Sequence, residues 1–203
     1  MRIVDPRLAA DLVSGRPVKL HLGGGSDIPA PGFYGVDVRS DAKAAAIADF
    51  NEPLELFPPD SVEEVHSEHT MEHVERFIPL LRELHRIVRR DGRIRFTVPH
   101  FSNPHYYSDP THVRFFGLYT MYYFMDPERQ PLDRKVPSFY ADVRFDVLEV
   151  KMTLQPRALL DRILTPFLSR RMNRNPRTME RFERRLCWMF PADLITYVFR
   201  PVK

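Results

Sequence analysis

Cysteine is almost absent from this sequence of 203 residues. The single residue Cys187 excludes an internal disulfide and any metal site built from several thiolates. No apolar run is long enough to cross a bilayer, and the first residues carry acids and lack the apolar core of a signal peptide. These absences favour a cytoplasmic protein, and the length suits one α/β domain covering residues 1–203.

Net charge is also low, at +3, but it is unevenly distributed. The segment from Arg157 to Arg185 holds nine arginines and three acids, whereas the remaining chain has 21 basic and 24 acidic residues. The segment belongs to a basic insertion, residues 155–193, with helices predicted at 156–169 and 176–189. Its pattern favours solvated helices packed on a sheet, and it leaves open a contact with an anionic membrane surface, a cover over the active site, or nucleic-acid binding.

Short apolar runs bounded by glycine, proline, aspartate or asparagine are typical of strands in a buried parallel sheet. Such runs occupy 18–22, 33–38, 44–50, 61–67, 93–99, 145–152 and 194–200. A short helix is predicted over 5–13, and the clearest helix covers 75–90, where apolar residues recur on one face. Because this helix lies between two strands and ends at a glycine turn, a βαβ unit and a parallel sheet are expected.

Three glycines, Gly23, Gly24 and Gly25, follow the first of these strands directly. Glycine allows positive φ and close approach of backbone N–H groups to a ligand. The spacing is neither that of a dinucleotide fingerprint nor that of a P-loop, which argues against a phosphate ligand. Asp37 ends the next strand, where an acid can accept hydrogen bonds from both ribose hydroxyls of an adenosine, and Asp49 ends the third strand in the same way.

These motifs, in this order, resemble a known family. The similar segments are, in order, KLHLGGGSD, GFYGVDV, IADFNEP, SEHTMEHV, the DG turn and RIRFTVPHF. In these segments the chain is similar to the class I S-adenosylmethionine-dependent methyltransferases usually called type 11. The resemblance covers roughly residues 18–101. It implies a Rossmann-like, mostly parallel sheet of seven strands with helices on both faces, in which the last strand, here 194–200, is antiparallel.

The resemblance also implies a cofactor, S-adenosyl-L-methionine, and roles for particular residues. The glycine turn, including Gly24, would bind the cofactor, with Gly23 and Gly25 beside its methionine part; Asp37 would bind the ribose. The remaining assignments are Asp49 and Phe50 to the adenine, and Ser67 and His69 to the methionine and the reacting methyl.

Three departures from the family pattern bear on cofactor affinity. His21 replaces the usual acid or asparagine, and Gly24 stands where cysteine or another residue is common. Ten residues, 23–32, separate the first two strands. That is short for a helical crossover, so we expect a turn in place of the usual first helix.

The segment from His69 to His73 fits the H-x-x-E-H pattern of zinc proteases. It begins at a strand end and not inside a long helix, and the methyltransferase motif already accounts for it. Glu72 and His73 are expected to anchor the start of the following helix. We therefore expect no metal site there.

The richest segment chemically is 98–124, which follows the carboxyl end of the 93–99 strand. It holds nine of the chain's 24 aromatic residues, as expected of an acceptor pocket. A hydroxyl acceptor must lose a proton, which makes His112 or His105 the candidate general base, with Asp109 orienting one of them. The alternatives are a purely structural loop, or a metal bound by His100, His105 and His112, a set without diagnostic spacing.

The function predicted from the sequence is methyl transfer, with O-methylation of a small molecule or glycan as the first interpretation. If the basic insertion contacts a membrane, a lipid-linked glycan would be the acceptor. One rival is a nucleic-acid-binding or RNA-modifying methyltransferase, for which the sequence lacks an Asn-Pro-Pro-Tyr-type base pocket and a recognised RNA-binding module. The other is a non-catalytic domain that keeps the fold without the cofactor.

Overall fold

The computed structural model describes residues 1–25, 28–40, 43–154 and 159–203, with the side chains of 159–164 left out of the description. The predicted start of the first insertion helix, residues 156–158, therefore lies outside the described residues. The strands are β1 (Arg2–Ile3), β2 (Val18–Leu22), β3 (Phe33–Asp37), β4 (Ala46–Ile47), β5 (Val62–Glu68), β6 (Val88–Pro99), β7 (Arg144–Leu154) and β8 (Ala192–Val202). The α-helices are α1 (Pro6–Val13), α2 (Phe77–Ile87), α3 (Leu159–Met172) and α4 (Pro176–Arg185), and the 3-10 helices are η1 (Met71–His73), η2 (Pro104–Ser108), η3 (Thr120–Phe124) and η4 (Pro127–Arg129).

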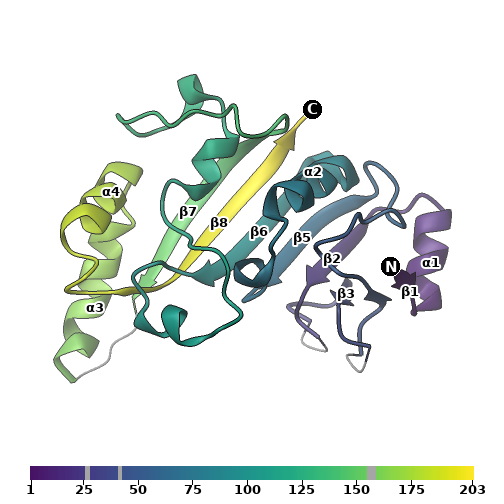
Figure 1. Cartoon of the computed structure of the whole chain (residues 1–203), viewed down its shortest axis with the longest axis horizontal. Coiled ribbons are helices and arrows are strands. Elements are labelled where there is room, and N and C mark those ends of the chain that lie inside the picture. The colour runs from purple at the N-terminus through teal and green to yellow at the C-terminus, as the bar shows by residue number, and fades with distance from the viewer. Residues whose placement is uncertain (26–27, 41–42, 155–158) are drawn as a thin grey trace.

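The eight strands form one sheet in the order β1-β4-β3-β2-β5-β6-β8-β7 (Figure 1). Strands β2, β3, β4, β5 and β6 pair with one another in parallel. Strand β8 runs antiparallel to both β6 and β7. The Rossmann-like sheet with an antiparallel last strand is thus confirmed. The count of seven strands is low by one, because β1 adds two residues antiparallel to β4.

The helices follow the sequence pattern with shifted ends. Asp5 caps α1, since its Oδ1 accepts the Arg7 backbone N–H at 2.8 Å. The long helix predicted over 75–90 is shorter, and its last residues open β6, where Val88 pairs with Val62. Val88 is buried in the sheet. An apolar residue at this position is compatible with a helix face and with a buried strand, so its type could not distinguish the two.

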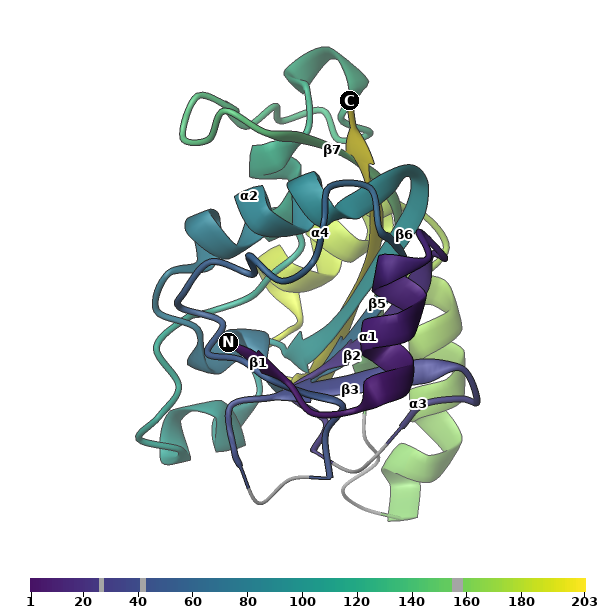
Figure 2. The same ribbon diagram turned by 90° about the vertical axis from the view of Figure 1, so that its right-hand side faces the viewer.

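The helices flank the sheet unequally. Helix α2 and helix α3 lie on opposite sides of the sheet, as Figure 2 shows, while α3 and α4 gather at its β7 end. The predicted arrangement with helices on both faces is confirmed. Among the described residues of the connections from β2 to β3 and from β3 to β4 there is no helix, which agrees with the turn expected over 23–32. One continuous apolar core joins the strands to α1, α2 and α4. In the described part of the chain, no helix combines the length and the apolar character that a bilayer crossing needs.

A change at Gly23 tests how tightly the end of β2 is packed. Its φ is +77°, and an added Cβ would lie 2.1 Å from the Thr70 Oγ1 atom. We expect Gly23→Ala to lower the unfolding free energy by about 2–4 kcal/mol, which corresponds to a loss in melting temperature of about 5–15 °C by calorimetry. Gly15→Ala is the matched control, because φ is +71° there but a Cβ would meet no described atom within 4 Å. Equal losses in the two variants would show that the contact with Thr70 contributes nothing.

Candidate functional site

The glycine turn after β2 is held against the end of β5. The Leu22 carbonyl oxygen, at the end of β2, lies 3.1 Å from the Ser67 hydroxyl and 3.2 Å from the Thr70 hydroxyl. The side chain of Thr70 occupies the volume that a Cβ of Gly23 would need. The turn therefore needs glycine for both its conformation and its packing.

Asp37, at the end of β3, is joined to the same turn. Its Oδ2 accepts the backbone N–H of Gly25 at 2.8 Å, and its Oδ1 accepts that of Arg39 at 2.9 Å. The residue is buried, with 5% of its surface exposed. Each carboxylate oxygen has about two acceptor sites, so one on each remains for a ligand with two neighbouring hydroxyls.

A cavity of about 1020 Å³ opens at these strand ends, and we call it the strand-end cavity. Seven of the eight residues predicted to bind the cofactor line it: Gly23, Gly24, Gly25, Asp37, Asp49, Phe50 and His69. Ser67 does not line it but lies buried beneath it, bonded to Leu22. The structure thus brings the predicted set to one place, and the binding role of each residue stays a prediction.

The rest of the cavity wall consists of residues that the sequence did not assign to cofactor binding. They are Val38, Arg39, Lys43, Asn51, Thr70, His73, Val74 and Thr111. Residues 38 and 39 follow Asp37, and residue 51 lies two positions after Asp49. Their closeness to these strand-end acids was a signal in the sequence that they could line the same cavity. Thr111 comes from the loop after β6, and its sequence gives no sign that it returns to this cavity.

Asp49 and Asn51 connect the cavity to the start of α2. The Asn51 backbone N–H donates to Asp49 Oδ1 at 2.9 Å, and the Asn51 side-chain oxygen accepts the Arg76 backbone N–H at 2.9 Å. Phe50, between them, is buried. An exposed carboxylate and an apolar ring therefore lie next to each other at the cavity, which is a suitable surface for a flat heterocycle with an amino group.

His69 holds an unusual backbone conformation at the edge of the strand-end cavity. Its φ is +51°, which non-glycine residues rarely adopt, so local strain is stored at this position. Its Nδ1 lies 3.5 Å from Oε1 of the buried Glu72, and this carboxylate raises the pKa of the His69 imidazole. His69 thus places a basic group at the cavity.

The predicted catalytic residues lie together only in part. His112 Nε2 is 3.7 Å from Asp109 Oδ2, so the expected pairing of Asp109 with one histidine is met by His112. His105 is exposed, and its backbone N–H donates to Asn103. His105, Asp109 and His112 are not among the residues lining the strand-end cavity, although Thr111 between two of them is. The identity of a general base stays a prediction.

His100 has a structural role. Its Nδ1 accepts the Ser102 backbone N–H at 3.1 Å, so the ring carries its proton on Nε2 and donates it to Glu183 Oε1 at 3.0 Å. The same Glu183 oxygen accepts the Leu118 backbone N–H at 2.6 Å. With both nitrogens engaged, His100 does not join His105 and His112 as a metal ligand, and these three are not among the ligand sets that converge in the described chain.

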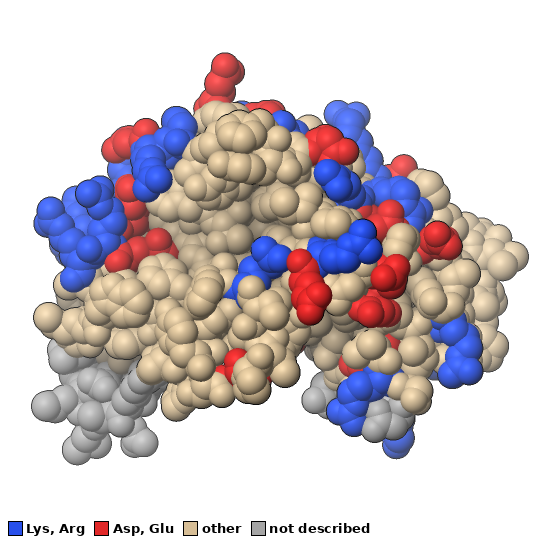
Figure 3. Space-filling view, in the orientation of Figure 1, with Lys and Arg blue, Asp and Glu red and all other residues tan. Residues whose placement is uncertain are grey.

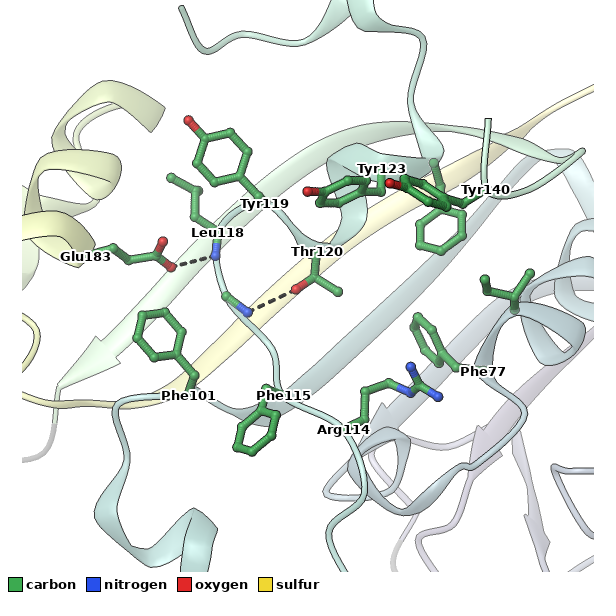
Figure 4. A pocket seen from close by; sticks show the side chains of 13 residues that line it. Phe77, Phe101, Arg114, Phe115, Leu118, Tyr119, Thr120, Tyr123, Tyr140 and Glu183 are labelled. Atoms are coloured by element: carbon green, nitrogen blue, oxygen red, sulfur yellow. Dashed lines mark hydrogen bonds between the residues drawn. The ribbon is translucent and has the colours of Figure 1, made fainter. Parts of the chain in front are cut away.

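A second cavity, of about 580 Å³, lies on the face between α4 and α2. Figure 3 shows a hollow in this face that is mainly tan, with charged side chains around it, and Figure 4 shows the aromatic rings that line the hollow. We call it the aromatic cavity; its lining includes Phe77, Phe101, Phe115, Tyr119, Tyr123 and Tyr140. The aromatic pocket expected within 98–124 is therefore present, with Phe77 and Tyr140 added from elsewhere.

Two chain segments separate the aromatic cavity from the strand-end cavity. Val74 and Thr111 line the strand-end cavity, whereas Phe77 and Arg114 line the aromatic one. The Arg114 guanidinium joins the segments, because it donates to the Glu75 carbonyl oxygen at 2.9 Å and stacks over the Phe77 ring at 5.2 Å. The two cavities are thus neighbours across a wall in which Arg114 links the two segments.

Comparison with known proteins identifies the fold. A SAM-dependent methyltransferase from Archaeoglobus fulgidus superposes with a TM-score of 0.54 at 18% identity, over 96% of this chain and 90% of that one. The YcgJ protein from Bacillus subtilis superposes with a TM-score of 0.50 at 14% identity, over 97% of each chain. No established protein-family pattern and no curated protein sequence matches the chain. The class I methyltransferase fold predicted from the sequence is confirmed, and the narrower type 11 assignment stays a prediction.

The role of Glu183 can be tested by removing its carboxylate. In Glu183→Ala, the N–H groups of Leu118 and His100 lose their acceptor, and we expect a loss of about 2–5 kcal/mol in unfolding free energy. Glu183→Gln keeps a carbonyl oxygen at the same place and should lose less than half as much. Urea unfolding followed by circular dichroism measures both, with Glu128→Ala, an exposed glutamate, as control. A loss as small as that of the control would mean that the buried contacts are not formed.

Proposed function

We propose that the protein is an S-adenosylmethionine-dependent methyltransferase that binds its cofactor in the strand-end cavity. The observation that carries the proposal is the convergence of Gly23–Gly25, Asp37, Asp49 and Phe50 on one cavity in a fold that methyltransferases share. In open α/β sheets, ligands bind at the carboxyl ends of the strands. The cavity has the size of a small-molecule site.

The residues present fit this cofactor chemically. Asp37 offers an acceptor site on each oxygen for the two ribose hydroxyls, and the Asp49 carboxylate beside the Phe50 ring suits an adenine. The glycine turn leaves room for the methionine part. When bound, the cofactor supplies a methyl group on a positively charged sulfur, so the protein's task is to position the acceptor in line with it.

The acceptor is proposed to be a hydroxyl of a small molecule or glycan bound from the side of the aromatic cavity. Aromatic walls with few polar groups suit sugar rings and other flat apolar faces. Within this proposal, His112 oriented by Asp109, or His105, takes the hydroxyl proton. Asp109 Oδ2 lies 3.7 Å from His112 Nε2, so His112 is the histidine that Asp109 pairs with; a ligand bound at that nitrogen would leave the role of base to His105.

Titration calorimetry tests the cofactor proposal directly. We expect S-adenosylmethionine and S-adenosylhomocysteine to bind, and Asp37→Ala to weaken both about tenfold to a hundredfold, because two charge-assisted hydrogen bonds are lost. The affinity of Asp37→Asn for each ligand should lie between those of the wild type and Asp37→Ala. Asp142→Ala, which removes an exposed acid paired with Arg82 at 2.6 Å, is the control. Wild-type protein that is folded and releases no heat at two temperatures would refute the proposal.

We further infer a contact with an anionic membrane surface, carried by the end of the basic insertion. Arg184 is 75% exposed, and Trp188 and Met189, three and four residues after the end of α4, expose 70% and 71% of their surfaces. Blue side chains gather over α4 in Figure 3. Exposed aromatic and apolar side chains beside arginines are typical of segments that lie in a lipid interface. The Trp188 ring lies 5.8 Å from that of Phe101, which lines the aromatic cavity, so a lipid-linked acceptor would reach this cavity from the surface.

Trp188 is the only tryptophan, so its fluorescence reports on this surface. We expect its emission to shift to shorter wavelength with anionic vesicles, not with neutral ones, and the shift to weaken with added salt. A double change, Arg181→Glu with Arg184→Glu, should abolish the shift, whereas Arg89→Glu with Arg90→Glu, a charge-matched control, should keep it. An absent shift with vesicles together with salt-sensitive binding of RNA would favour the nucleic-acid alternative instead.

A further inference from the structure

The carboxylate of Glu72 is buried without a hydrogen-bond donor. The residue exposes none of its surface, and neither Oε1 nor Oε2 has a hydrogen-bond partner among the described residues. Its nearest described cation is His69, whose Nδ1 is 3.5 Å away, at the limit of a useful contact. An ionised carboxylate in such a place is costly unless a cation compensates it.

His73, the next residue, presents a free ring nitrogen. Its Nδ1 is 2.9 Å from Thr111 Oγ1, and that hydroxyl lies 2.6 Å from the carboxylate oxygen Oδ1 of Asp109. Because the hydroxyl gives its proton to Asp109, it must accept from His73, so the imidazole carries its proton on Nδ1. The lone pair of His73 is therefore on Nε2.

His112 has the same arrangement. Its Nδ1 lies 2.9 Å from the carbonyl oxygen of Tyr106, which can only accept, so this nitrogen also carries the proton. The lone pair is again on Nε2. The two rings pack edge to face with their centroids 4.8 Å apart. Histidines that ligate metals are characteristically held in this way, with the other nitrogen donating to a carbonyl or a carboxylate-linked group.

We propose that Glu72, His73 and His112 form a binding site for a divalent transition-metal ion of the zinc type. One ligand atom from each residue lies within 4.8 Å of the others. Two imidazoles and one carboxylate suit zinc, iron, cobalt or nickel better than magnesium or calcium, which prefer oxygen ligands. Metal–ligand bonds of about 2.1 Å place tetrahedral ligands about 3.4 Å apart, so the partly exposed histidine rings close in by roughly an ångström when the ion binds.

Three protein ligands leave one coordination position open. His73 lines the strand-end cavity, so the open position would face this cavity and be filled by water or a ligand there. The site differs from the zinc-protease pattern, because the third ligand is His112 and not His69. It also departs from the expectation that this segment binds no metal. That expectation rested on the H-x-x-E-H residues alone, and the sequence does not show that the loop after β6 places His112 beside them.

The experiment uses protein stripped with a chelator and titrated with Co²⁺, whose visible absorption reports bound nitrogen and oxygen ligands. We expect one Co²⁺ per chain, displaced by one equivalent of Zn²⁺, and a rise in melting temperature of about 5–10 °C at saturating Zn²⁺. Glu72→Gln and His112→Ala should each lose the absorption, while His105→Ala, from the same loop and exposed, should keep it.

Each outcome decides the proposal. Glu72→Gln removes a buried charge and retains the side-chain shape, so we expect it to fold, and circular dichroism checks this for every variant. The proposed site is overturned if the wild type shows no Co²⁺ absorption. It is also overturned if the Glu72→Gln and His112→Ala variants show the same absorption as the wild type. The titration needs no S-adenosylmethionine, so its result is independent of the methyltransferase proposal.

Discussion

The contact between the end of β2 and the end of β5 is the constraint on which the rest of the site depends. The Leu22 carbonyl oxygen lies beside two hydroxyls from the β5 end, and the Thr70 side chain fills the volume beside Gly23. Only a residue without a Cβ allows this approach. With the turn fixed there, Gly25 reaches Asp37 on β3, and three strand ends share one cavity. The entropy lost in fixing the backbone at Gly23 is thus part of what it costs to assemble the site.

The strands and helices that the sequence predicts well are those whose patterns have a single explanation. The run at 18–22 coincides with β2, and 194–200 lies inside β8, because short buried strands need a continuous apolar stretch. The residues 88–90 were assigned to a helix because Val88 fits a helical face, but pairing with β5 decides their state. Strand β1, with two residues, carries no pattern at all and forms through its pairing with β4. Long-range pairing is information that local periodicity does not contain.

The same distinction applies to the site. Residues at the ends of parallel strands could be predicted to meet, since those ends share one edge of the sheet, and seven of the eight do. Thr111 and His73 were not predicted to line the cavity, because the long connection after β6 returns to it through contacts nearly forty residues apart in sequence. The role of His100 depends on Glu183, which is 83 residues away in α4. Residue type alone does not distinguish such a structural histidine from a catalytic one.

Glu72 shows how a buried charge narrows the chemistry that remains open. A carboxylate buried in this way is stabilised by a nearby cation, because hydrogen-bond donors to it are lacking among the described residues. The hydrogen bonds to Thr111 and Tyr106 place the proton of each ring on Nδ1 and leave Nε2 as the acceptor. Three acceptor residues whose ligand atoms lie within 4.8 Å of one another are the arrangement that a bound cation stabilises. The partner that each histidine already has leaves its Nε2 as the nitrogen available to that cation.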